Sequence, residues 1–291
     1  MNTPKRIEAV LPPPPANMVG DGFRVHNFFP NGYRIQRRIS PFFLLDYNAP
    51  IEFPASDRPR GVGVHPHRGF ETVTIAYQGH VAHHDSAGNS GVIDPGDVQW
   101  MTAGSGVLHK EYHEEAFSRS GGPFQMVQLW VNLPAKDKMT DPRYQSIRHA
   151  DKGVMVLPND AGTVYVIAGN YHGAQGPAHT FSPIEMYDVR LHAKGSMDME
   201  LPAAYNTGIL VVKGRVSVNG ENAVADRFVL FKNEGTSIHV DASEESILLV
   251  LSGEPINEPI AHYGPFLMNT PEQVQQAIAD FGTGKFGVLE D

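Results

Sequence analysis

Apolar residues in this chain occur mainly as short runs separated by turns that contain glycine or proline. Between residues 61 and 135, apolar segments at 72–77, 98–101 and 124–131 alternate with turns such as Asp94-Pro95-Gly96-Asp97. Short segments rich in Val, Ile, Phe and Tyr with this punctuation are typical of antiparallel strands. The pattern therefore predicts an all-β protein.

The second half of the chain repeats part of the first. Residues 75–79 (Ile-Ala-Tyr-Gln-Gly) match residues 210–214 (Leu-Val-Val-Lys-Gly) as a strand, a polar residue and a turn glycine. Residues 104–109 likewise correspond to residues 234–239, and an apolar strand follows in each half. Internal duplication of one β-barrel explains this repeat most simply.

The chain length allows two domains. With 291 residues, the chain can form two cores of about 100 to 150 residues each. Lysines and aspartates stand between prolines at residues 134–142, which indicates an exposed connection. We therefore expect an N-terminal domain at 1–140 and a C-terminal domain at 141–291.

The clearest helix signal closes the chain. Thr270 is placed to cap the helix, Pro271 suits its first position, Gln273 completes a capping box and Gly282 ends it. Three apolar residues share one face, which we expect to pack on a barrel: Val274, Ile278 and Phe281.

Charge and composition exclude several classes of function. Lys and Arg total 23 against 32 acidic residues, without a basic cluster, so direct nucleic-acid binding is not expected. No run approaches the roughly 18 to 20 apolar residues that span a bilayer, so a membrane protein is not expected either. Prolines at 12–15 interrupt the stretch that a signal peptide would need, which favours a cytoplasmic location.

The chain contains no cysteine, so any metal must be held by nitrogen and oxygen atoms. His65 and His67 flank a proline that favours extended backbone, and residues i and i+2 of a strand point to the same face. One such pair is weak evidence by itself, because the chain has 14 histidines. It becomes informative only beside a second pair.

His109 and Glu111 form that second pair on another predicted strand, after a glycine turn. Two pairs of this kind can enclose one ion, while Lys110 points away from it. Three histidines and a glutamate suit divalent iron, manganese, nickel, cobalt, copper or zinc. Such a set leaves positions open on the ion, which indicates chemistry or ligand exchange and not a purely structural site.

At this point the chain resembles the pirin family, a group within the cupin superfamily. The matching segments follow the family's order and span most of the chain: residues 65–73 (His-Pro-His-Arg-Gly-Phe-Glu-Thr-Val), 95–104, 109–111, 129–133 and 264–269. The resemblance implies two tandem cupin barrels of the double-stranded β-helix or jelly-roll type, with the helix at the C-terminus. It also implies ligation of one metal ion, most commonly iron, in the first barrel by four residues: His65, His67, His109 and Glu111.

Glu71 is a competing carboxylate. It shares strand parity with His65 and His67 and stands where many other cupins have their ligating glutamate. The resemblance to pirins implies that Glu111 is the ligating carboxylate. Glu71 would then lie behind the ligands or in the core. Direct ligation by Glu71 remains an alternative from the residues alone.

The second half lacks part of the ligand pattern. His239 and Asp241 align with the second pair of the first half, whereas Glu200 and Pro202 occupy the positions of its first pair. A divalent ion is poorly held by two ligands, so we expect a degenerate second barrel without metal.

Other histidines do not extend the candidate site. His80, His83 and His84 crowd a predicted turn, where polar residues are usually solvated. His109 and His113 have the i, i+4 spacing of helical zinc proteases, but a lysine replaces the required glutamate next to the first histidine. Four large side chains are expected in the core or along an apolar pocket over the metal: Trp100, Trp130, Phe124 and Met126.

The resemblance implies a dioxygenase of the quercetin type, which opens a flavonol ring with O2 and releases carbon monoxide. The expected partners are therefore a small aromatic substrate and O2, with Glu111 as the base that takes the substrate's hydroxyl proton. The alternative is a binding module without turnover, because the eukaryotic pirin is regarded as a nuclear co-regulator that responds to the metal's oxidation state. That alternative requires a protein partner. The chain shows neither a localisation signal nor a basic patch, which favours the enzyme.

Overall fold

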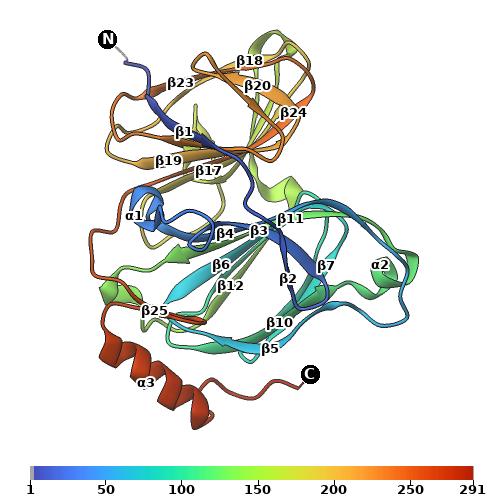
Figure 1. Ribbon diagram of the computed structural model, residues 1–291, viewed down its shortest axis with the longest axis vertical. Helices are drawn as coiled ribbons and strands as arrows, with labels where there is room; N and C mark the ends of the chain where they lie inside the picture. The colour runs from blue at the N-terminus through green and yellow to red at the C-terminus, as the bar shows by residue number, and fades with distance from the viewer. Residues whose placement is uncertain (1–2, 291) are drawn as a thin grey trace. The chain divides into compact units, whose positions relative to one another are not determined.

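A computed structural model describes residues 3–290, which form mainly antiparallel sheets (Figure 1). None of the helices in this range is both long and apolar enough to cross a membrane. The chain divides into two compact units. We call them the first barrel (residues 15–34, 42–149 and from Ile256 onwards) and the second barrel (residues up to Pro14, 35–41 and 150–255).

The first barrel contains two main sheets, with strand orders β12-β9-β6-β11-β4-β3-β2 and β5-β10-β7-β8. Its strands are β2 (Asn17–Val19), β3 (Phe23–Phe29), β4 (Phe42–Phe53), β5 (Gly61–His67), β6 (Phe70–Gln78), β7 (Val81–Asp85), β8 (Ser90–Ile93), β9 (Val98–Thr102), β10 (Val107–His113), β11 (Gly122–Asn132), β12 (Arg143–Ile147), β25 (Ala261–Tyr263) and β26 (Phe266–Met268). Its helices are α2 (Glu115–Ser120) and α3 (Pro271–Gly282).

The second barrel repeats both orders, as β1-β22-β19-β24-β17-β14-β13 and β18-β23-β20-β21. Its elements are β1 (Ile7–Leu11), α1 (Gln36–Ile39), β13 (Gly153–Val156), β14 (Gly162–Ala168), β15 (Asn170–Tyr171), β16 (Ala174–Gln175), β17 (Ile184–Leu191), β18 (Ser196–Glu200), β19 (Asn206–Lys213), β20 (Arg215–Val218), β21 (Glu221–Val224), β22 (Phe228–Phe231), β23 (Ser237–Ala242) and β24 (Ser246–Gly253). The matching orders confirm the all-β fold with two cupin barrels.

The two observed units do not correspond to a division of the chain at the single expected boundary, residue 140. Strand β1, at the start of the chain, pairs with β22 of the second barrel, and the segment from Ile256 belongs to the first barrel. Strand β12 also continues the first barrel by pairing with β9, beyond the expected linker at 134–142. Each barrel is therefore assembled from separate stretches of chain.

The expected linker is not an exposed connection throughout. Lys138 is 1% exposed, and its Nζ donates hydrogen bonds to the Asn132 side chain and to the carbonyls of Gly69 and Leu267, at 2.7–2.8 Å. A buried ammonium is tolerated when its donors are satisfied. Lys138 thus ties together the β5–β6 turn, β11 and β26.

Helix α3 begins as the sequence predicts. Thr270 is its N-cap, and the capping box with Gln273 is formed. Val274 is buried beside β25 and β26, as expected for a packed face. The rest of the expected apolar stripe is wrong, because Ile278 and Phe281 are 42% and 43% exposed. Ala277 is buried in their place, since the buried face runs through positions 274, 277 and 280.

Candidate metal centre

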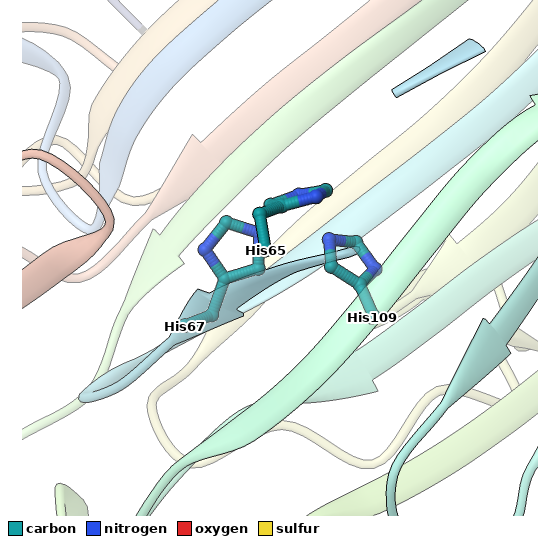
Figure 2. A group of neighbouring side chains, drawn as sticks. All are labelled: His65, His67 and His109. Atoms are coloured by element: carbon teal, nitrogen blue, oxygen red, sulfur yellow. The ribbon is translucent and has the colours of Figure 1, made fainter. Parts of the chain in front are cut away.

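Three histidines converge in the first barrel (Figure 2). His65 and His67 lie on β5 and His109 lies on β10, where His109 is the register partner of His65. Their candidate ligand nitrogens all lie within 4.8 Å of one another. In residues 3–290 this is the only group of three or more His, Cys, Asp or Glu residues arranged to hold a metal ion.

The buried nitrogens of this group fit a metal ion. Nδ1 of His67 and both ring nitrogens of His109 are buried without a hydrogen-bond partner among the described residues. Such atoms are costly unless something binds them. Burial holds the pKa of His67 and His109 well below its usual range, so both rings are neutral, the form that coordinates metals.

Glu111 lies two residues beyond His109 on β10 and lines the same cavity as His65 and His67. Its carboxylate accepts hydrogen bonds from Thr74 Oγ1 at 3.2 Å and Gln128 Nε2 at 2.7 Å. Burial raises the pKa of Glu111. The structure therefore places Glu111 beside the histidines, but not within the cluster of nitrogens that lie within 4.8 Å of one another.

A cavity of about 330 Å³ opens over His65, His67 and Glu111. This volume is at the lower end of the range for small-molecule sites. Trp130 and Met126 line it, and the Trp130 ring lies 5.4 Å from the His67 ring. The other two large side chains of the sequence prediction, Trp100 and Phe124, are fully buried in the core.

Comparison with known proteins identifies the family of this chain. Residues 22–131 match the model of the Pirin family, and residues 186–287 match that of the Pirin C-terminal cupin domain. The chain belongs to the pirin family. The first match contains all three histidines and Glu111, and the second covers most of the strands of the second barrel.

Several relatives resemble this pirin over most of their length. A Pseudomonas aeruginosa protein, named only provisionally as a quercetin 2,3-dioxygenase, is 50% identical over 92% of this chain and 93% of its own. Human pirin is 35% identical over 86% of this chain and 84% of its own. The crystal structure of a quercetin 2,3-dioxygenase from Acinetobacter baumannii aligns with a TM-score of 0.94 at 45% identity, covering 99% of this chain and all of that one.

Glu71 of this pirin lies on the sheet face opposite to Thr74. Its Oε1 accepts a hydrogen bond from Thr102 Oγ1 at 2.7 Å, whereas Thr74 bonds to Glu111. The strand parity shared by Glu71 and His67 in the sequence is lost because the chain turns between β5 and β6 at Gly69, with φ of +88°. Burial raises the pKa of Glu71 to about 7.

The expectation that His83 is solvated was wrong. His83 is 0% exposed and lies within β7, opposite Glu111 in register. Its Nε2 lies 2.7 Å from Tyr144 Oη, and the two rings stack 4.7 Å apart. Because His83 and His84 lie on a strand and not in a turn, neighbouring residues point to opposite faces. His80 and His84, on either side, are partly exposed.

His113 also lies on a strand, so the helical protease pattern does not apply. Its ring is buried beside Phe53 and Phe124, and its Nε2 lies 2.8 Å from the carbonyl oxygen of Gly22. It is not one of the three grouped histidines.

His239 and Asp241 of the second barrel point outward, so their alignment with the first barrel's ligands was wrong. His239 is exposed and its ring nitrogens contact Asp198 at 2.7 Å and Asp241 at 3.2 Å. Between them, Val240 is fully buried. The sequence match placed the pair one residue away from the inward-facing positions of β23, and a shift of one residue reverses the face of a strand.

Proposed function

We propose that this pirin binds one divalent transition-metal ion, with iron as the first candidate, through four residues: His65, His67, His109 and Glu111. We further propose that it cleaves a flavonol with O2 and releases carbon monoxide. The observation that carries this proposal is the convergence of three histidines, two of which line a largely apolar cavity. The names of the Pseudomonas and Acinetobacter relatives support the same reaction class.

When bound, the metal ion would supply Lewis acidity toward a deprotonated substrate hydroxyl and leave positions open for exchange. The chain's own residues would hold the substrate, exclude water and position the metal ligands. Trp130 and Met126 provide an apolar wall that can hold a flat aromatic ring and exclude water. His65 Nδ1 lies 2.8 Å from the carbonyl oxygen of Gly63, which fixes the ring and leaves Nε2 free to ligate.

Glu111 is proposed to accept the substrate's hydroxyl proton. Its carboxylate lines the cavity in which the substrate hydroxyl would lie, so it is placed to accept that proton. Thr74 and Gln128 hold it in place through the hydrogen bonds described above. A carboxylate held beside the ligand cluster can both contact the metal and receive a proton.

The test combines metal analysis with product analysis. The protein is purified without oxygen, its metal content is measured, and oxygen consumption and carbon monoxide release are followed after addition of quercetin. Glu111→Gln should retain metal but lose about a hundredfold or more of the carbon monoxide rate. Conversion at the unaltered rate by metal-loaded Glu111→Gln would refute the proton role.

Asp241→Asn is the matched control, because this carboxylate lies on the outer face of the second barrel. It should leave metal content and rate unchanged. Metal binding without turnover in the unaltered protein would contradict the dioxygenase and favour the binding module instead. Protein that binds no metal under any loading condition would contradict both.

A further inference from the structure

A row of polar residues crosses the large sheet of the first barrel next to the candidate ligands. On the inner face of the large sheet, Gln128 of β11 is the register partner of Asp46 of β4, which in turn lies opposite Asn27 of β3. Asn48 stands two residues beyond Asp46, so both side chains point to the same face. Asp46, Asn48 and Gln128 all line the cavity.

The row of polar residues extends across the sheet away from the candidate metal ligands. Gln128 donates its Nε2 hydrogen bond to Glu111, and Asp46 lies one strand further on. Adjacent strands are about 4.8 Å apart, so Asp46 and Asn48 face a part of the cavity beyond the metal centre. A molecule bound to the metal centre would present its remote end to these two residues.

The burial of the Asn48 side-chain amide is not explained by contacts within the fold. It is 0% exposed, and neither its Oδ1 nor its Nδ2 has a hydrogen-bond partner among residues 3–290. A buried amide without partners is uncommon and destabilising, and in a ligand cavity it commonly serves to bind the ligand. Asp46 differs, because one of its oxygens accepts a 2.6 Å hydrogen bond from Asn27.

The chemistry of the pair favours a hydroxyl group. The Asn48 amide offers both a donor and an acceptor, and a hydroxyl can satisfy either. A carboxylate or phosphate on the ligand would be repelled by ionised Asp46. Burial raises the pKa of Asp46 to about 6, so its charge is costly in this cavity and a neutral polar partner is favoured. The surrounding wall is apolar, including Phe23, Val25 and Val62.

We propose that Asp46 and Asn48 select an aromatic substrate that carries hydroxyl groups on the end remote from the metal ligands. This inference rests on the proposed flavonol substrate and adds a specificity determinant to it. A site that hydrogen-bonds a substrate hydroxyl discriminates strongly against an analogue that lacks it, because its buried polar groups are then left unpaired. The metal centre alone would not make this distinction.

Two probes separate the metal-facing and remote ends of the ligand. Quercetin carries several hydroxyl groups, whereas 3-hydroxyflavone has the same ring system with only the hydroxyl next to the carbonyl. Dissociation constants of both are measured by fluorescence titration without oxygen, with metal-loaded and metal-free protein. The unaltered protein should bind quercetin at least about tenfold more tightly, as one or two hydrogen bonds would give.

Asn48→Leu should reduce this preference to about twofold or less while leaving the affinity for 3-hydroxyflavone unchanged, because it replaces an unpaired amide by an apolar group of similar size. Asp46→Asn, which keeps the shape and removes the carboxylate, should reduce the preference as well and provides a second test if Asn48→Leu is poorly folded. The matched control is Asp241→Asn, the same change as Asp46→Asn at a carboxylate on the outer face of the second barrel. It should retain the preference.

The outcomes distinguish this inference from the dioxygenase proposal. A preference that survives in both Asn48→Leu and Asp46→Asn, or an equal loss of affinity for both probes, overturns the inference. Loss of the preference in the variants supports it, even if the unaltered protein releases no carbon monoxide and the dioxygenase proposal fails. If neither flavonol binds the unaltered protein, both proposals are overturned.

Discussion

The two barrels have one strand order but opposite chemistry on their inner faces. In the first barrel, β5 and β10 direct His65, His67 and His109 toward one another. In the second, the corresponding strands β18 and β23 direct apolar side chains inward: Met197, Met199, Ile238 and Val240. The same scaffold thus holds either a polar ligand cluster or a continuous apolar core.

This difference shows what a cupin barrel requires for folding. The second barrel closes with an apolar interior and keeps its polar groups, such as His239, on the outside. Burial of apolar groups stabilises the fold, whereas partnerless buried imidazoles destabilise it. The histidines of the first barrel therefore do not help the barrel to fold by themselves, which supports the proposed role in metal binding.

The largest expected effect comes from removing one candidate ligand. His67→Ala should lower metal affinity by more than about a hundredfold, because loss of even a ligand's hydrogen-bond partner typically costs tenfold to a hundredfold. Metal content after dialysis against a weak chelator provides the measurement. His239→Ala, in the outer face of the second barrel, is the control and should keep full content. Equal metal content in the two variants would contradict the proposed difference in metal binding between the two barrels.

A change in the apolar core of the second barrel should lower stability and leave metal binding unchanged. Ile238→Ala should lower the free energy of unfolding by about 2 to 5 kcal/mol, since it leaves a cavity in a fully packed core. Urea denaturation measures the loss, and metal content should not change. The control is Val156→Ala, whose side chain is 69% exposed and should contribute within about 0.5 kcal/mol. A metal loss in Ile238→Ala would show that the barrels are not independent in this respect.

The smallest expected effect concerns a buried carboxyl of the first barrel. The pKa of Glu71 is raised from 4.5 to about 7, so the folded protein keeps a proton that the unfolded chain loses. The free energy of unfolding therefore falls as pH rises from about 4.5 to 7. Glu71→Gln should remove this loss and gain about 3 kcal/mol at pH 8 relative to its effect at pH 4.

Urea denaturation of both proteins at pH 4, 6 and 8 tests this expectation. The second barrel offers a matched control in Asp188, a buried carboxylate 3.2 Å from Arg190 and 3.9 Å from Lys152. Asp188→Asn should destabilise the protein at pH 8, because it leaves buried positive charge without its partner. The same pH dependence in Glu71→Gln as in the unaltered protein would contradict the raised pKa of Glu71.

Local patterns in the sequence predict much of this structure. Turn glycines such as Gly79 and Gly214 reveal the duplication, because a positive φ at the end of a strand recurs in both barrels. The two-residue period of a strand brings His65 and His67 to one face without any tertiary information. The cap of α3 is also local, since Thr270 and Gln273 interact across a single turn.

The remaining features depend on contacts between distant residues. The outward direction of His239 follows from which face of β23 is buried, and the sequence match was one residue out of phase with that face. The burial of Lys138 requires carbonyls from Gly69 and Leu267, which are far away along the chain. The unpaired amide of Asn48 emerges only when the cavity around it is assembled.

The interleaved assembly of the barrels has a consequence for biosynthesis. The barrel that carries the three histidines includes the segment from Ile256 onwards, where Asp280 pairs at 2.8 Å with Arg68, the residue next to His67. That segment follows residues 150–255 of the second barrel along the chain, whereas domains otherwise tend to fold in order from the N-terminus. The histidine cluster therefore reaches its final support only after residues 150–255 of the second barrel have been synthesised, and metal loading should follow that step.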